Sequence, residues 1–127
     1  MISGRAKYYI MQAAEEEQDA AIRAHGLFHS DHEAWAVLKE EVEELLELFD
    51  ENKRYVDIDN LWDKVRRDET ISMGDMTEIY NWAKSCAKEA VQVMAMIQKW
   101  GESNEQREPE EGRSGGDEDQ RHFKQRD

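Results

Sequence analysis

The sequence predicts an all-α protein built as a helical bundle, and three observations lead to this prediction. Residues that favour helices, among them Ala, Glu, Lys, Gln and Met, dominate the 127-residue chain. Proline occurs once, at Pro109. Apolar side chains recur with the period of a helix over three long stretches. A chain of this length suits one domain with a modest core.

The first two helices have recognisable ends in the sequence. The first is predicted over residues 5–24, with Gly26 just beyond it as a terminator. The second is predicted to begin after Ser30, which can cap the helix while Glu33 reaches back in a capping box. Its apolar period continues to about residue 49.

The last two helices are separated from these by a connector that mixes charged and apolar residues. We expect one short helix within the connector, over residues 59–67. A second capping-box pattern, at Asp75 and Glu78, opens the third long helix, which is predicted to run to residues 100–101.

The composition changes after residue 101. Residues 102–127 carry 9 acidic and 5 basic side chains, with Phe123 as the one large apolar residue. Such a segment has little apolar surface to offset the entropy of folding. We therefore expect a folded domain over residues 1–101 and an acidic, disordered tail over residues 102–127.

Charge and cysteine content exclude several classes of protein. The formal net charge of −13 argues against nucleic acid as a partner, because such proteins neutralise phosphates with cations. Cys86 is the only cysteine, so the chain cannot form an internal disulfide, and a reducing cytoplasm is the expected compartment. No stretch approaches the roughly 18 apolar residues of a membrane-spanning helix, so no membrane partner is expected.

One glutamate of the stretch EEVEELLE, residues 40–47, falls on the apolar face of the second predicted helix. At about 100° per residue, the residues within about 60° of Glu41 are Ala34, Val37, Leu38, Leu45 and Leu48. Glu44 lies at the edge of this arc, whereas the neighbouring glutamates rotate toward the polar face.

The third long helix repeats this arrangement around Glu89. The residues within about 60° of it are Trp82, Cys86, Val93, Met96 and Trp100. Gln92 lies at the edge of the arc, as Glu44 does in the other helix. Each helix therefore carries two polar residues, three positions apart, on a face that is otherwise apolar.

An ionised carboxylate on an apolar face is costly unless a cation meets it. Neither arc carries Arg or Lys at the level of these glutamates, so Mg²⁺ is the simplest partner for a set of oxygen ligands. Di-iron bundle proteins use Glu-x-x-His steps, and no histidine follows a glutamate by three here. This weakens the alternative of a metal-storage bundle.

The two half-motifs resemble those of the MazG-like nucleotide pyrophosphohydrolases, all-α enzymes with E-E-x-x-E on one helix and E-x-x-D on a later one. The stretch EEVEE, residues 40–44, matches the first half. The stretch EAVQ, residues 89–92, matches the second half with Gln92 in place of Asp, which resembles a variant of phage-type members. The resemblance covers about residues 27–101.

The resemblance implies hydrolysis of a nucleoside triphosphate to the monophosphate and pyrophosphate, with Mg²⁺ or Mn²⁺ as cofactor. Purine deoxynucleotides, dGTP and dATP, are the leading substrates. The implied metal ligands are Glu41, Glu44, Glu89 and, as a neutral ligand, Gln92; Glu40 is the candidate acceptor of the water's proton. MazG-like proteins assemble as dimers or tetramers, so a homo-oligomer is implied, in the host cytoplasm if the chain is phage-encoded.

Further side chains are candidates for substrate contacts, namely Glu33, Asn81, Lys88 and Trp35. Asn81 and Lys88 flank the apolar face on the side of Gln92 and suit a triphosphate or sugar. Trp35, like Trp82 and Phe28, can stack on a base. The carboxylate of Glu33 can accept hydrogen bonds from guanine.

Each of these residues also has a purely structural interpretation. Tryptophans at helical spacing usually lie in a core or a subunit interface, and glutamates on helices are often solvated and ion-paired. The amide of Gln92 can simply complete a hydrogen-bond network. The competing function is a noncatalytic helical interaction module whose glutamates face a partner's basic surface.

Overall fold

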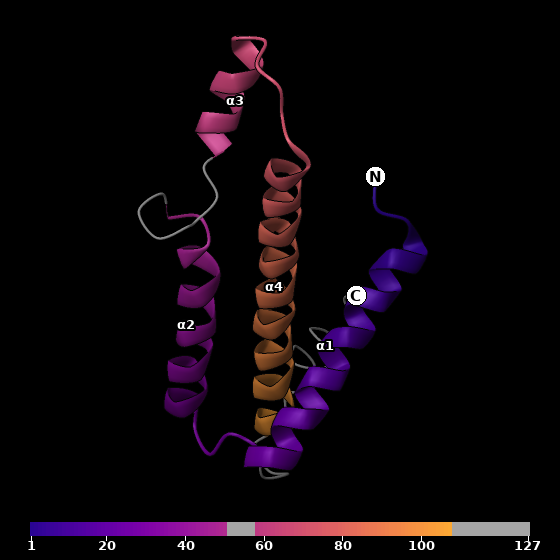
Figure 1. Cartoon of the computed structure of the whole chain (residues 1–127). Coiled ribbons are helices and arrows are strands. Elements are labelled where there is room, and N and C mark those ends of the chain that lie inside the picture. The colour runs from indigo at the N-terminus through magenta and orange to yellow at the C-terminus, as the bar shows by residue number, and fades with distance from the viewer. Residues whose placement is uncertain (51–57, 108–127) are drawn as a thin grey trace. The chain divides into compact units, whose positions relative to one another are not determined.

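The computed structural model describes residues 1–50 and 58–107, which form four helices (Figure 1). These are α1 (Gly4–His25), α2 (Asp31–Glu47), α3 (Ile58–Arg66) and α4 (Met73–Arg107). No strand occurs among these residues, so the all-α prediction is confirmed. Within the same ranges, no helix combines the length and the apolar character needed to cross a membrane.

The chain divides into two compact units, and α2 and α4 each run from one unit into the other. The described part of the first unit comprises residues 1–41 and 91–107. That of the second comprises residues 42–50 and 58–90.

In the first unit, α1 has the ends that its sequence favours. The Ser3 hydroxyl accepts a hydrogen bond from the backbone N–H of Ala6 at 3.1 Å and so caps the first turn. Gly26 follows the last residue with a φ of 75°, and its N–H donates to the carbonyl of Ile22. A left-handed φ suits glycine, which lacks a Cβ. The predicted helix over residues 5–24 is therefore confirmed.

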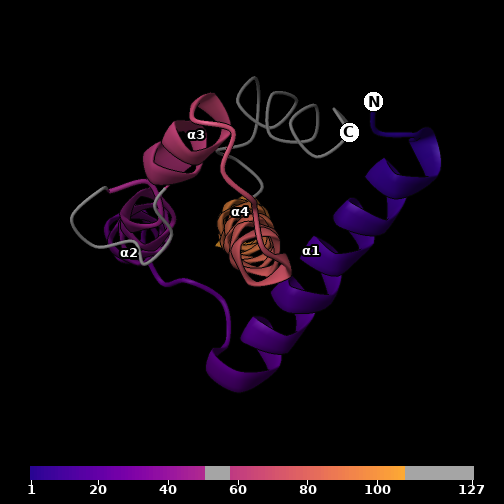
Figure 2. The same ribbon diagram turned by 45° about the horizontal axis from the view of Figure 1, so that its top comes forward.

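The core of the first unit gathers around the last turns of α4, which lie between α1 and the first turns of α2 (Figure 2). Its buried residues come from all three helices and the α1–α2 loop: Ala14, Phe28, Ala34, Leu38, Ala95, Met96, Lys99 and Ser103. Four of these eight residues are small, namely Ala14, Ala34, Ala95 and Ser103, which lets the helices approach closely.

The helix α4 continues beyond its predicted end at residues 100–101 and reaches Arg107, with Gly101 inside it. The physical reason is the set of contacts made by its last two turns. The backbone N–H of Phe28 donates to the Ser103 hydroxyl at 2.8 Å, and the Arg107 guanidinium donates to the Phe28 carbonyl at 3.1 Å. Residues 102–107 are thus helical, and the predicted disorder of residues 108–127 lies outside the described residues.

The start of α4 also differs from the prediction, because the capping box lies one turn earlier. The Ser72 hydroxyl accepts from the Asp75 N–H at 3.0 Å, and the Asp75 carboxylate accepts from the Ser72 N–H at 3.2 Å. Asp75 is therefore the acidic member of the box and not the cap. At α2, Ser30 accepts from the Glu33 N–H at 3.1 Å, as expected of a cap.

The second unit contains the end of α2, α3 and the first half of α4. The indole N–H of Trp82 on α4 donates to the Leu48 carbonyl at 2.6 Å, just beyond the end of α2, and the Trp82 ring meets Phe49 edge to face. The Lys64 ammonium of α3 pairs with Asp75 of α4 at 3.3 Å. Among residues 42–50 and 58–90 no side chain is fully buried.

Candidate metal centre

Three carboxylates converge where the sequence predicted them. Each of Glu41, Glu44 and Glu89 offers one oxygen, and these oxygens all lie within 4.8 Å of one another. Glu41 and Glu44 are three residues apart on α2, so helix geometry places them on one face. Glu89 reaches them from α4. The three acidic residues predicted as metal ligands are therefore brought together.

The burial of the three carboxylates follows their predicted positions on the helix faces. Glu41 and Glu89 are half-buried, whereas Glu44, expected at the edge of its arc, is exposed. The Oε2 atom of Glu89 is buried and has no hydrogen-bond partner. A buried carboxylate oxygen without a donor loses its hydration without compensation. A hydrogen-bond donor or a cation beside this oxygen would compensate the loss.

Gln92 and Glu40 are the other two residues predicted at this centre, and their roles stay predictions. Gln92 is half-buried on α4, three residues after Glu89 and hence on a neighbouring part of the same face. Glu40 is exposed on α2, about 100° around the helix axis from Glu41. An exposed carboxylate beside the group can exchange protons with solvent.

The four candidate substrate residues lie outside the carboxylate group itself. The carboxylate of Glu33 is 3.3 Å from Nδ1 of His29. Trp35 is 53 % exposed on α2. Lys88 is exposed and Asn81 half-buried, both on α4. Their contacts with a substrate stay predictions.

The expectation that Phe28 can stack on a base is wrong. Its side chain is 3 % exposed, and the Lys99 ammonium covers its ring at 4.2 Å from the centroid. A buried ring that already meets a cation has no free face for a nucleobase. Phe28 is a core residue of the first unit.

Comparison with known proteins adds no identification: no protein-family model, no curated protein and no solved structure matches the chain. The resemblance to the MazG-like enzymes therefore stays a prediction from the two half-motifs. What the structure shows of the predicted site is the convergence of the three carboxylates and the unpaired oxygen of Glu89.

The sequence analysis missed one buried charge, Lys99, whose side chain is 4 % exposed. Burial lowers the pKa of this lysine, and the charge of Glu33 partly opposes the shift. Its helical spacing gave a signal, because Lys99 lies one turn from Ala95 and one turn from Ser103, and all three are buried on one face of α4.

Proposed function

We propose that the chain is a metal-dependent nucleoside triphosphate pyrophosphohydrolase of the MazG-like type, with Mg²⁺ as cofactor and Mn²⁺ as a substitute. The reaction cleaves the anhydride bond between the α- and β-phosphates with water and yields the monophosphate and pyrophosphate. The observation that carries the proposal is the buried, unpaired Oε2 of Glu89 within a group of three carboxylates.

The residues present fit a hard divalent cation. Glu41, Glu44 and Glu89 supply carboxylate oxygens, which Mg²⁺ prefers as ligands, and Gln92 supplies a neutral amide oxygen. A bound divalent cation would offset the mutual repulsion of the carboxylates and give the Glu89 Oε2 atom a partner. When bound, the cation supplies positive charge for the phosphates and lowers the pKa of a nearby water.

The chain's own side chains would bind and orient the substrate. The exposed carboxylate of Glu40, next to the ligand Glu41, accepts the proton released when water adds to phosphorus. The ammonium of Lys88 and the amide of Asn81 suit triphosphate or sugar oxygens, and both belong to α4 as Glu89 does.

The proposed substrates are purine deoxynucleotides, dGTP and dATP, in line with the phage-type resemblance. Trp35 presents 53 % of its surface, so its ring remains available for stacking on a base. The Glu33 carboxylate is part-exposed beside His29 and can accept hydrogen bonds from the amino and imino groups of guanine. This favours guanine over adenine.

The test is a panel of the eight common ribo- and deoxynucleoside triphosphates at equal subsaturating concentration with Mg²⁺. Monophosphate and pyrophosphate are separated by chromatography. We expect dGTP and dATP to be cleaved fastest. Pyrimidine substrates cleaved at least about tenfold faster, which is about 1.4 kcal/mol in transition-state binding, would contradict the purine assignment. Release of inorganic phosphate would contradict the reaction.

Site variants assign the activity to the carboxylate group. We expect Glu41→Gln and Glu89→Gln to remove Mg²⁺-dependent turnover, because each change removes one negative charge at nearly constant shape. Glu16→Gln makes the same change at an exposed position of α1 and is the matched control. Near-wild-type rates in either purified site variant would reject the metal assignment.

The second candidate is a noncatalytic helical interaction module. The observation in its favour is the exposed apolar surface of the second unit, where Leu46, Trp62, Met73 and Tyr80 are all at least 59 % exposed. Pyrophosphate release that is lost in the Glu41 and Glu89 variants would exclude a purely noncatalytic role. We also propose that the chain forms a homo-oligomer, as its resemblance implies.

A further inference from the structure

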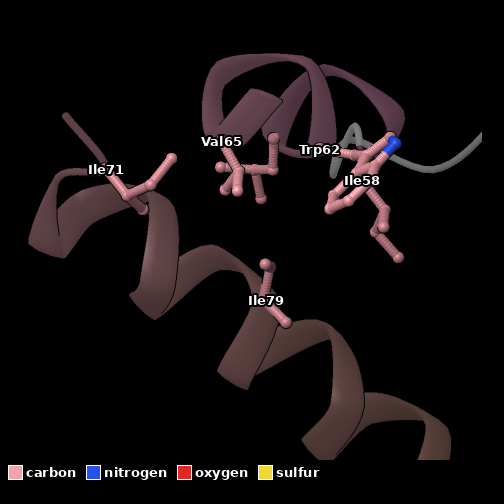
Figure 3. A pocket seen from close by; sticks show the side chains of 6 residues that line it. Ile58, Trp62, Val65, Ile71 and Ile79 are labelled. Carbon is pink, nitrogen blue, oxygen red and sulfur yellow. The ribbon is translucent and has the colours of Figure 1, made fainter. Parts of the chain in front are cut away.

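The second unit carries an apolar pocket of about 290 Å³ between α3 and the start of α4 (Figure 3). It is lined by Ile58, Leu61, Trp62, Val65, Ile71 and Ile79. In Figure 3 the labelled side chains of α3 face Ile71 and Ile79 across the pocket. None of the six belongs to the group of three carboxylates or to the candidate substrate residues. The proposed reaction therefore does not account for this pocket.

Exposed apolar surface continues along both walls of the pocket. On α3, Trp62 is 59 % exposed, and Val65 is also exposed. On α4, the i, i+3, i+7 spacing of three exposed residues places them on one helix face: Met73, Met76 and Tyr80. Met76 lies about 60° around the helix axis from the lining residue Ile79. The apolar surface is thus elongated, which suits the side of a helix.

Acidic side chains predominate around this surface. Residues 58–79 carry six acidic and three basic side chains. Each basic side chain is already paired with an acidic one: Lys64 with Asp75, Arg66 with Asp63, and Arg67 with Glu69. The other three carboxylates are exposed and make no ion pair within the described part of the chain: Asp59, Asp68 and Glu78.

The three unpaired carboxylates lie close to the pocket in the sequence. Asp59 follows the lining residue Ile58, and Glu78 precedes the lining residue Ile79. Asp68 lies in the loop between α3 and α4, three residues before Ile71. An apolar pocket bordered by unpaired carboxylates attracts a ligand that is both apolar and cationic.

This combination selects one kind of occupant. A second copy would bring the same excess of three carboxylates and be repelled at this surface. The chain's own basic stretch, residues 121–126, offers one large apolar side chain, Phe123, for a pocket lined by six. An amphipathic helix presents several apolar side chains along one face, and its other face can carry Lys or Arg.

We propose that α3 and the start of α4 form a docking groove for a basic amphipathic helix of another protein. The apolar face of that helix contacts Trp62 and the pocket, and its cations meet Asp59, Asp68 and Glu78. The proposal does not depend on the proposed reaction. Pyrophosphate release can fail while a helix binds, and a chain that releases pyrophosphate can lack the groove's activity.

The probe is a fluorescein-labelled peptide of about 18 residues, or five helical turns, with Leu along one face and Lys along the other. One control peptide has Glu in place of Lys, and a second has the same composition in an order without an apolar face. Binding to the full chain is followed by fluorescence anisotropy at about 0.15 M salt. We expect the basic amphipathic peptide to bind with a dissociation constant below about 100 μM and each control peptide at least about tenfold more weakly.

Protein variants locate the bound peptide. We expect Trp62→Ser to raise the dissociation constant at least about tenfold, because an exposed tryptophan beside a pocket is a typical anchor. Trp35→Ser changes a tryptophan of similar exposure, 53 %, on α2 and is the matched control. It should bind the peptide as the wild type does.

Charge variants cover the case in which Trp62→Ser fails to fold, since they change exposed side chains without ion pairs. The triple variant Asp59→Asn, Asp68→Asn, Glu78→Gln should bind the peptide at least about fivefold more weakly and with less dependence on salt. The triple variant Glu15→Gln, Glu16→Gln, Glu17→Gln removes the same charge from exposed positions of α1 and should bind as the wild type does.

Four outcomes would overturn the proposal. The first two are equal binding of the three peptides and wild-type binding by folded Trp62→Ser. The third is an equal loss in both triple variants, which would indicate general attraction to a chain of net charge −13. The fourth is equally tight binding of a peptide of residues 117–127, which would assign the groove to the chain's own C-terminal segment.

Discussion

Ser103 on α4 accepts a hydrogen bond at 2.8 Å from the backbone N–H of Phe28, 75 residues earlier in the chain. The same hydroxyl donates to the Lys99 carbonyl at 2.7 Å, so both of its bonds are made inside the core. Ser103 is completely buried and Phe28 is 3 % exposed. One side chain thus satisfies a backbone donor of the α1–α2 loop that water cannot reach.

Truncation should show how much the hydrogen bonds from the end of α4 to the Phe28 backbone contribute to stability. A chain that ends at Gly101 lacks Ser103 and Arg107, the two residues that bind the backbone of Phe28. An unpaired buried backbone group costs about 1–3 kcal/mol, so we expect the truncated chain to melt several degrees lower. A chain that ends at Arg107 keeps both residues and is the control. Equal melting temperatures for the two would show that residues 102–107 do not stabilise the first unit.

The buried ammonium of Lys99 should make stability depend on pH. Burial lowers its pKa below that of an unfolded lysine. In the window between the folded pKa and the ordinary value, the unfolded chain binds more protons, so stability rises with pH. We expect Lys99→Met to melt higher than the wild type at pH 7 and the difference to shrink as the pH rises toward the ordinary lysine value. A difference that is constant in pH would show that packing alone separates the two proteins.

The Asp75 carboxylate, the acidic member of the capping box, should make stability depend on pH in the acidic range. The hydrogen bond from the Ser72 backbone and the bond from Lys64 hold its pKa below the ordinary value for an aspartate. This contribution to stability is present above the unfolded pKa and is lost as the pH falls through the folded pKa. Asp75→Asn should therefore melt lower than the wild type at pH 7, with the gap closing in acid. Asp59→Asn, on the exposed start of α3, is the control and should show no such gap.

In the absence of metal, removing one negative charge from the group of three carboxylates should stabilise the folded protein. In EDTA we expect Glu89→Gln to melt higher than the wild type, because the change weakens repulsion among three carboxylates within 4.8 Å. Added Mg²⁺ should raise the melting temperature of the wild type more than that of the variant. Glu16→Gln controls for the loss of one surface charge. A clear destabilisation of Glu89→Gln in EDTA would indicate a structural ion-pair partner instead.

The carboxylate group could be predicted because helix periodicity alone sets which residues share a face. Glu41 and Glu89 fell among apolar neighbours on their helices, and the structure places their carboxylates together with that of Glu44. Helix ends were harder to predict, because they depend on contacts from far along the chain. Gly101 is a plausible terminator in the sequence, yet the helix passes through it since Ser103 and Arg107 are held by Phe28.

The residue at which α4 begins was also hard to predict, because two capping-box patterns overlap there in the sequence. Asp75 and Glu78 satisfy the spacing of a capping box as well as Ser72 and Asp75 do, and the serine hydroxyl is the one that caps α4. The burial of Phe28 and Lys99 depends on how three helices meet, which no single helix reveals. These residues illustrate the part of the fold that requires tertiary contacts.

The first unit is discontinuous in the chain, which has a consequence for how it is made. Its bonds between Phe28 or Asp31 and α4 join residues 69 to 79 positions apart. A ribosome that adds about 5–20 residues per second releases α1 and α2 several seconds before Ser103 and Arg107 emerge. During that interval the α1–α2 loop lacks the groups that fix it. The first unit can therefore be completed only after the whole second unit has left the ribosome.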